Sequence, residues 1–231
     1  RTLYICAFGK GVYKSIDGGR TWQKKNKGIE DANPAAWRLT QDKNGTLYLV
    51  VFRKSDDGSM GNKRDGALYK SDDGAETWQK IQLPKGVNGP SSLIVDPMDS
   101  KRLILGAWGR YGKNEFSGNV GGGIYVSEDG GRNWKGVLTK DQHIHDLTID
   151  SKKGVFYAAG FNASAYRSVD RGRTWKRIKG FNFKWGKRVQ PDPVNEEKIY
   201  IITFGGGVWH GPAIGDKNAL EDIVTPKTAF D

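Results

Sequence analysis

Short runs of apolar residues, separated by polar and glycine-rich stretches, recur along the whole chain. Five such runs lie at residues 3–8, 46–52, 102–108, 155–161 and 198–204. The last four each follow a segment that alternates polar and apolar residues and ends in aspartate, at residues 37–42, 91–96, 145–150 and 187–192. Runs of this length, bounded by turn residues, predict short β-strands rather than helices. The pattern therefore predicts an all-β protein.

A shorter strand with an aromatic residue follows each apolar run, at residues 12–13, 68–69, 124–125, 165–166 and 208–209. After the first four comes an octet of one pattern: SIDGGRTW at 15–22, SDDGAETW at 71–78, SEDGGRNW at 127–134 and SVDRGRTW at 168–175. The tryptophans that end the octets are 56, 56 and 41 residues apart. Repeats of this size suit sheets of four short antiparallel strands, which are the blades of a β-propeller.

Each octet has the residues of a tight hairpin turn between the third and fourth strands of a blade. Its aspartate can accept hydrogen bonds from turn N–H groups, the following glycine supplies a positive φ, and the serine and threonine hydroxyls close the turn. Its tryptophan can pack on the base of the hairpin. We therefore expect a structural role for the four octet aspartates, Asp17, Asp73, Asp129 and Asp170.

The octets match the Asp-box, or BNR, motif Ser-x-Asp-x-Gly-x-Thr-Trp, and over about residues 1–210 the chain resembles the Asp-box β-propeller superfamily. That superfamily includes sialidases, xyloglucan-cleaving endoglucanases and related bacterial polysaccharide enzymes, sortilin-type receptors and a photosystem assembly factor. The resemblance implies a propeller fold, whereas enzymes and non-enzymes share the motif. Ala75 replaces a motif glycine and Asn133 replaces the threonine, so we expect distortion of those two turns.

The repeat units divide the chain into about 4.5 blades: a partial blade at 1–28, blades at 29–83, 84–139 and 140–180, a partial blade at 181–210, and a tail or linker at 211–231. The first unit lacks the inner strand, and the last lacks the octet and the fourth strand. The two ends therefore cannot combine into one blade, and an open array would expose apolar faces. We expect a larger ring, completed by the remainder of a parent chain or by a partner.

The charge balance points to an acidic partner. Lysine and arginine number 37 against 26 aspartates and glutamates, a net charge of +11, which suits a polyanionic glycan, a nucleic acid or a membrane face. The basic residues are spread over many turns rather than forming one stripe, which disfavours nucleic acid. No run approaches 18 apolar residues, so no membrane span is expected.

The ends and the cysteine content bear on the cellular compartment. The lone Cys6 permits no internal disulfide, which fits a reducing compartment or a bacterial export route that does not depend on disulfides. The chain begins at Arg1 without a methionine, as a processed or truncated piece would. With the resemblance to bacterial polysaccharide enzymes, we expect a secreted or periplasmic protein whose signal peptide lies outside this fragment.

The ligand site of a propeller is expected on the rim opposite the octets, where the connections between second and third strands meet the central channel. Two of those connections are long, at residues 53–66 and 109–123. The second mixes aromatic and charged residues, as a sugar platform does, although a mobile glycine-rich loop has the same composition. Candidate substrate-binding residues on this rim are Trp37, Trp108, Arg110, Tyr111 and Trp185.

Aligning the four alternating segments on their terminal aspartate reveals two polar columns. Four residues before the aspartate stand Arg38, Ser92, Asp146 and Arg188, and five before it stand Trp37, Ser91, His145 and Lys187. A carboxylate between two arginines predicts an anion-binding and acid–base site, with His145 and Asp146 as candidate catalytic residues and Arg38, His143 and Arg188 as binding residues. We expect His145 to titrate near neutral pH. The alternative is that the columns form salt bridges between blades.

No metal or cofactor is predicted. His143 and His145 share a strand face but have no evident third ligand. The oxygen-rich segment 56–62 lacks EF-hand spacing, so a solvated loop is expected there.

The residues and the resemblance together favour a carbohydrate-active propeller that binds and cleaves an anionic polysaccharide, as a glycoside hydrolase or lyase. An Arg-Ile-Pro triplet and an arginine triad are missing, which favours the glucan-cleaving or lyase branches over sialidases. No catalytic carboxylate pair can be assigned, since Asp146 and Glu115 are only candidates. The alternative function is a non-catalytic interaction or assembly scaffold, as in the receptor and assembly-factor branches.

Overall fold

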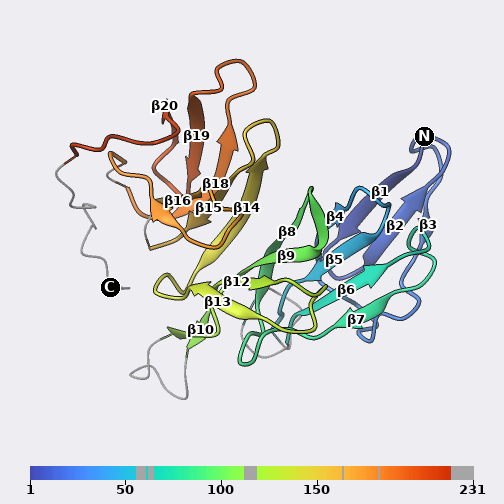
Figure 1. Cartoon of the computed structure of the whole chain (residues 1–231). Coiled ribbons are helices and arrows are strands. Elements are labelled where there is room, and N and C mark those ends of the chain that lie inside the picture. The colour runs from blue at the N-terminus through green and yellow to red at the C-terminus, as the bar shows by residue number, and fades with distance from the viewer. Residues whose placement is uncertain (56–60, 62–64, 112–118, 163, 182, 220–231) are drawn as a thin grey trace.

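The computed structural model describes residues 1–55, 61, 65–111, 119–162, 164–181 and 183–219 (Figure 1). These residues form strands and turns, and among them there is no helix that could cross a membrane. Five antiparallel sheets of three or four strands follow one another along the chain. A separate two-stranded ribbon pairs β10 (Arg110–Tyr111) with β11 (Asn119–Val120). The all-β prediction is confirmed.

Each sheet is an antiparallel meander whose strands follow one another in chain order, with the β10–β11 ribbon inserted in the third, and the sheets are named here blade 1 to blade 5. Blade 1 contains β1 (Leu3–Ala7), β2 (Gly11–Ser15) and β3 (Gln23–Lys24). Blade 2 contains β4 (Ala36–Gln41), β5 (Leu47–Val51), β6 (Ala67–Ser71) and β7 (Gln79–Ile81). Blade 3 contains β8 (Pro90–Asp96), β9 (Asp99–Ala107), β12 (Gly123–Ser127) and β13 (Lys135–Leu138). Blade 4 contains β14 (Ile144–Asp150), β15 (Val155–Gly160), β16 (Ser164–Ser168) and β17 (Lys176–Arg177). Blade 5 contains β18 (Gly186–Pro191), β19 (Lys198–Thr203) and β20 (Val208–Pro212).

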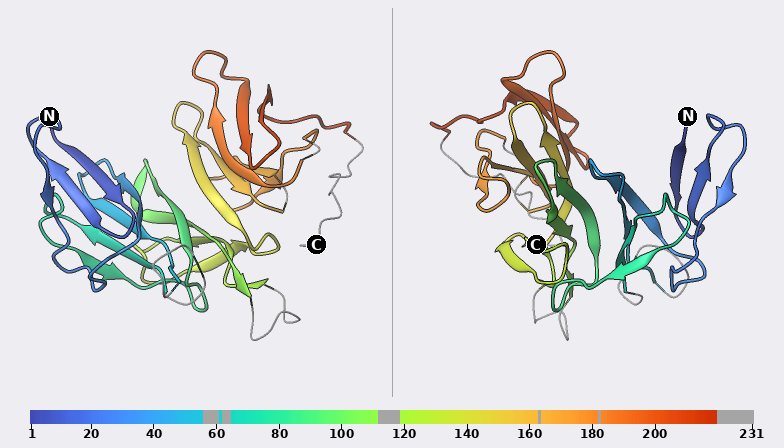
Figure 2. Two further views of the ribbon diagram at one scale, coloured as in Figure 1. Left: turned by 180° about the vertical axis from the view of Figure 1, so that it is seen from behind. Right: turned by 45° about the vertical axis from the view of Figure 1, so that its right-hand side comes forward.

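The blades are arranged side by side in chain order around a common axis. Inner strand β4 packs against β1 and β8, and inner strand β14 packs against β8 and β18. In Figures 1 and 2 the blue blade 1 and the red blade 5 stand at opposite ends of an open arc. The described residues therefore form a partial propeller, as the repeat pattern predicted.

The core is divided into four clusters, one between each pair of neighbouring blades. In β5, Leu47, Leu49 and Val51 pack toward blade 1, whereas Tyr48 and Val50 pack toward blade 3. Successive side chains of a strand point to opposite faces, so a strand buried on both sides needs apolar residues at every position. This explains why the second strand of each repeat is a continuous apolar run.

The octets form nearly identical turns on one rim. In blade 3, Asp129 accepts hydrogen bonds from the N–H groups of Arg132 and Asn133 at 3.0 and 2.9 Å, and the Ser127 hydroxyl accepts one from Gly131 at 2.8 Å. The expected distortion of the two variant turns is wrong. Ala75 adopts a φ of 70° and donates to Ser71 Oγ at 2.9 Å. The Asn133 side-chain amide donates to Asp129 at 2.7 Å, in place of the threonine hydroxyl.

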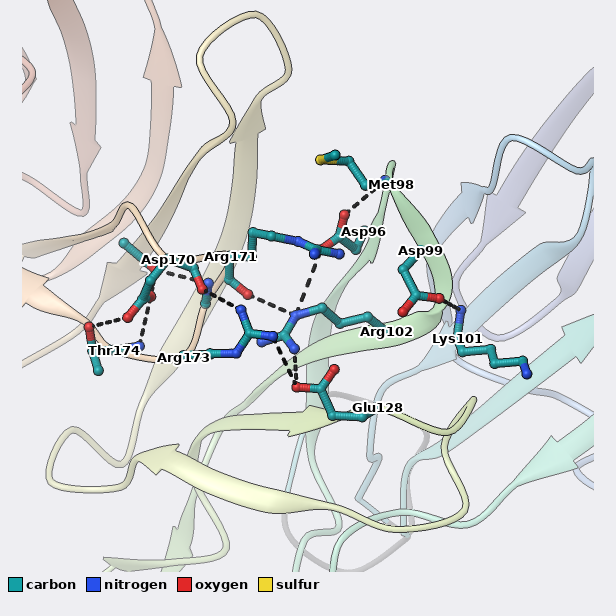
Figure 3. A network of polar contacts seen from close by, with 12 residues as sticks. Asp96, Met98, Asp99, Lys101, Arg102, Glu128, Asp170, Arg171, Arg173 and Thr174 are labelled. Carbon is teal, nitrogen blue, oxygen red and sulfur yellow. Dashed lines mark hydrogen bonds and ion pairs between the residues drawn. The ribbon is translucent and has the colours of Figure 1, made fainter.

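Buried arginine contacts join blades 3 and 4 on the same rim (Figure 3). Arg102 is fully buried, pairs with Glu128 and donates from Nε to the Arg171 carbonyl at 3.0 Å. Arg171 stands where the other octets have glycine, adopts a φ of 61°, and donates from Nε to Asp96 at 2.6 Å. The charged residues of the octet rim are thus used in packing one blade on the next.

Candidate functional site

On the opposite rim, an aromatic residue directly follows the long apolar strand of every blade, which is β1, β5, β9, β15 or β19. These five residues are Phe8, Phe52, Trp108, Phe161 and Phe204. Because the blades are related by rotation about one axis, residues at the same place in each repeat lie at the same height along that axis. The sequence analysis singled out only Trp108 of this column. The signal was present, since each aromatic is the last residue of its apolar run.

Four of these aromatic side chains, those of Phe52, Trp108, Phe161 and Phe204, help to surround a cavity of about 390 Å³, here called the aromatic cavity. Its lining includes Trp37, Phe52, Trp108, His145, Phe161 and Phe204. The ring centroids of Trp108 and Phe161 are 5.3 Å apart, those of Trp37 and Phe52 are 5.7 Å apart, and those of His145 and Phe204 are 5.1 Å apart. Blades 2 to 5 all contribute to this lining, so the cavity exists only in the assembled arc.

Each inner strand contains a β-bulge near its start, which the sequence did not predict. The pairing register shifts by one residue between residues 36 and 38, 90 and 92, 144 and 146, and 186 and 188. A bulge sets two residues against one on the partner strand and re-aims their side chains. Residues of both polar columns can therefore line one cavity, although a regular strand would point them to opposite faces.

Asp146 joins four blades. Its carboxylate is 3% exposed and lies 3.1 Å from Arg38 Nη2 of blade 2 and 2.5 Å from Arg188 Nε of blade 5. It also accepts hydrogen bonds from the Ser92 hydroxyl of blade 3 at 3.2 Å and from its neighbour Leu147 N at 3.0 Å. Sequence alignment thus placed the carboxylate and the two arginines together correctly, and the resulting contacts hold the inner strands in position.

Both histidines of the site are neutral near pH 7. Burial and the nearby Arg38 lower the pKa of His145 to about 4, and burial and Arg53 lower the pKa of His143 to about 4. The expectation that His145 titrates near neutral pH is therefore wrong, because an imidazolium is disfavoured in a half-buried site that already contains cations. His143 packs on Trp108, with ring centroids 4.7 Å apart.

A second cavity of about 590 Å³, here called the basic cavity, adjoins the first. The two cavities share Trp37, His145 and Phe204. The basic cavity is also lined by Arg38, Lys187 and Arg188, and none of its described lining residues is acidic. The rings shared by the two cavities therefore lie next to three cations, Arg38, Lys187 and Arg188.

Arg53 is a site residue that the sequence analysis missed. Its buried guanidinium donates to the carbonyls of Trp108 at 2.5 Å, Gly109 at 2.7 Å and Gly61 at 2.7 Å. Burial lowers its pKa to about 10. These bonds tie the loop after β5 to the loop after β9 and hold the backbone of Trp108 in place. Its position immediately after the aromatic column was the available signal.

The remaining candidates lie at the edge of this site or beyond it. Trp185 stacks on Phe161 with centroids 5.8 Å apart and an interplanar angle of 28°, and its φ is 63°. Arg110 and Tyr111 form β10, and Arg110 is not among the described residues lining the two cavities. Glu115 lies outside the described residues, as does segment 56–62 apart from Gly61. Within the described ranges no three histidine, cysteine, aspartate or glutamate residues are grouped to hold a metal ion.

Comparison with known proteins gives matches to one family and one fold. The family model Sortilin-Vps10, described as sortilin, neurotensin receptor 3, matches residues 10–158. A xyloglucanase of Paenibacillus sp is 27% identical over 217 residues, which cover 80% of this chain and 19% of that protein. The chain therefore spans about a fifth of the length of the curated relatives it matches.

Solved structures with low sequence identity share the propeller fold. The GH74 xyloglucanase from Xanthomonas campestris superposes with a TM-score of 0.66 at 18% identity, over 90% of this chain and 34% of that one. The structure of YCF48 bound to D1 peptide superposes with a TM-score of 0.61 at 14% identity, over 92% of this chain and 60% of that one. Because the family model covers most of the chain and the octets build propeller blades, the chain belongs to the Sortilin-Vps10 family of Asp-box β-propellers.

Proposed function

We propose that the channel rim binds a polysaccharide across the aromatic and basic cavities. The observation that carries this proposal is the aromatic column, in which blades 2 to 5 each contribute a ring to one apolar surface. Sugar rings have C–H faces that pack on aromatic side chains, and ligand sites are typically apolar pockets with a few polar groups. The resemblance to xyloglucanases supports a carbohydrate ligand. A secreted or periplasmic location is part of this proposal.

We also propose that the polysaccharide is acidic and that the protein cleaves it. Glycoside hydrolases need two carboxylates on either side of the scissile bond, but Asp146 is buried between two arginines and no described residue lining either cavity is acidic. A lyase needs a base to take the proton next to a sugar carboxylate, and cations to stabilise the charge that develops. Neutral His145 is the candidate base, and Asp146 orients the two arginines.

Completion of the ring by further blades is a separate proposal. Ile5 of β1 and Val208 of β20 are exposed at the two ends of the arc, although the corresponding strands of blades 2 and 3 are buried. These free sheet edges suit pairing with the remainder of a longer protein or with a partner.

A non-catalytic scaffold is the second candidate function. It is favoured by the lack of an available carboxylate among the described residues of the two cavities, and an apolar cavity also suits the side chains of a peptide. YCF48, which has the same fold, has been solved with a peptide bound.

Calorimetric titration with neutral and uronic-acid-containing oligosaccharides tests the proposal. Trp108→Ala should weaken glycan binding about tenfold or more, since about 1.4 kcal/mol corresponds to each factor of ten. Trp209→Ala is the matched control, because Trp209 packs on Phe181 and is not among the residues lining the two cavities. If the folded wild type binds peptides but neither glycan, the scaffold function replaces this one.

A further inference from the structure

The three cations of the basic cavity differ in whether a carboxylate already neutralises their charge. Arg38 and Arg188 both pair with Asp146. Lys187 is exposed, and within the described part of the chain no carboxylate lies within ion-pair distance of its ammonium group. That group lies 5.3 Å from the centroid of the Phe204 ring. The Lys187 ammonium is therefore held at the cavity wall by a cation–π contact that leaves its other side open.

The charges around Lys187 leave a local excess of positive charge. Arg38, Lys187 and Arg188 contribute three positive charges and Asp146 one negative charge. His145 adds none near pH 7, because burial and, to a smaller extent, Arg38 and Lys187 lower its pKa to about 4. An uncompensated excess at the wall of a cavity attracts an anionic group.

We infer that the basic cavity is a carboxylate subsite, and that Lys187 is the residue that distinguishes acidic from neutral glycans. This inference rests on the proposed function. The two cavities share a wall of Trp37, His145 and Phe204, so two linked sugar units fit with one in each cavity. A carboxylate on the unit in the basic cavity accepts a hydrogen bond from Lys187, while its ring packs on Phe204. An acidic peptide has a carboxylate of the same charge, but it has no sugar ring to pack on Phe204.

A matched pair of glycans isolates the charge. Oligogalacturonate and its methyl ester have the same sugar backbone, and only the first is an anion. The wild type should bind the acid form about tenfold more tightly at low salt, and the difference should shrink at about 0.5 M salt because charges are screened over a few ångströms there. Lys187→Met should remove this preference, chiefly by weakening the binding of the acid form.

A second lysine of the same blade is the control. Lys198 begins β19 on the octet rim, is exposed, and has the same charge, so Lys198→Met should keep the preference for the acid form. If Lys187→Met keeps it too, the inference fails while glycan binding stands. If the folded wild type binds neither glycan, the proposed function and the inference fail together. Binding of an acidic peptide in that case favours the scaffold.

Discussion

The two rims of the partial propeller are built in different ways. On the octet rim, repeated residues form repeated turns, and each aspartate bonds within its own octet. On the channel rim, the aromatic column repeats, but the residues of the two polar columns differ in type between blades: the second polar column contains tryptophan, serine, histidine and lysine. Their contacts are made between blades, as with Asp146. A repeated turn motif therefore marks the rim that supports the blades, and polar positions that vary from blade to blade mark the rim that can recognise a ligand.

The largest effect is expected from Asp146→Ala on the channel rim. The change leaves two arginines without their shared carboxylate, and breaking a buried ion pair costs about 3–5 kcal/mol. Arg188 is partly exposed, so we expect a loss near the lower end of this range, about 3 kcal/mol, in the free energy of unfolding measured with urea. Unchanged stability combined with lost turnover would instead support Asp146 as a catalytic acid.

A smaller loss of stability is expected from Asp129→Ala on the octet rim. The variant removes the acceptor of two backbone N–H groups and of the Asn133 amide, so the blade 3 turn loosens and Tm falls by several degrees. Glycan affinity below the new Tm should not change. Asp99→Ala, which removes one exposed acceptor, is the control. A loss of affinity without a change in Tm would reverse the roles of the two rims.

The two rims should lose stability in different pH ranges. The folded pKa of His145 is about 4, below its usual 6.5, so the unfolded chain binds the proton first and stability falls as pH drops from 6.5 toward 4. Turn hydrogen bonds lower the pKa of Asp129 from 3.8 to about 2, so its contribution is lost as pH drops from about 4 to 2.

Urea midpoints measured between pH 7 and 2 check this separation. His145→Gln should reduce the loss of stability in the first range, to which His143 also contributes, and Asp129→Asn should reduce the loss in the second, to which the other octet aspartates contribute. A His145→Gln profile that overlays the wild type would mean that the histidine is solvated in the folded state.

The smallest effect is expected from Asn133→Thr, which restores the common octet residue. The Asn133 amide already makes the bond to Asp129 that a threonine hydroxyl makes in the other turns, so the free energy of unfolding should change by less than about 0.5 kcal/mol. Thermal denaturation of the variant and of the wild type under the same conditions measures this change. A gain well above this value would indicate that the turn is strained.

Sequence alone determined the blades, the octet turns and the meeting of Arg38, Asp146 and Arg188. These features depend on local turn chemistry, on period-two alternation and on the repeat that sets residues about 50 positions apart at one height. Only the tertiary structure decided that the inner strands bulge at Trp37 and His145 and that Arg53 lies buried under Trp108. It also decided which cation of the basic cavity, Lys187, has no carboxylate partner among the described residues, and it decided the pKa of His145. Bulges, burial and ion pairing arise from contacts between neighbouring blades, and no single repeat encodes them.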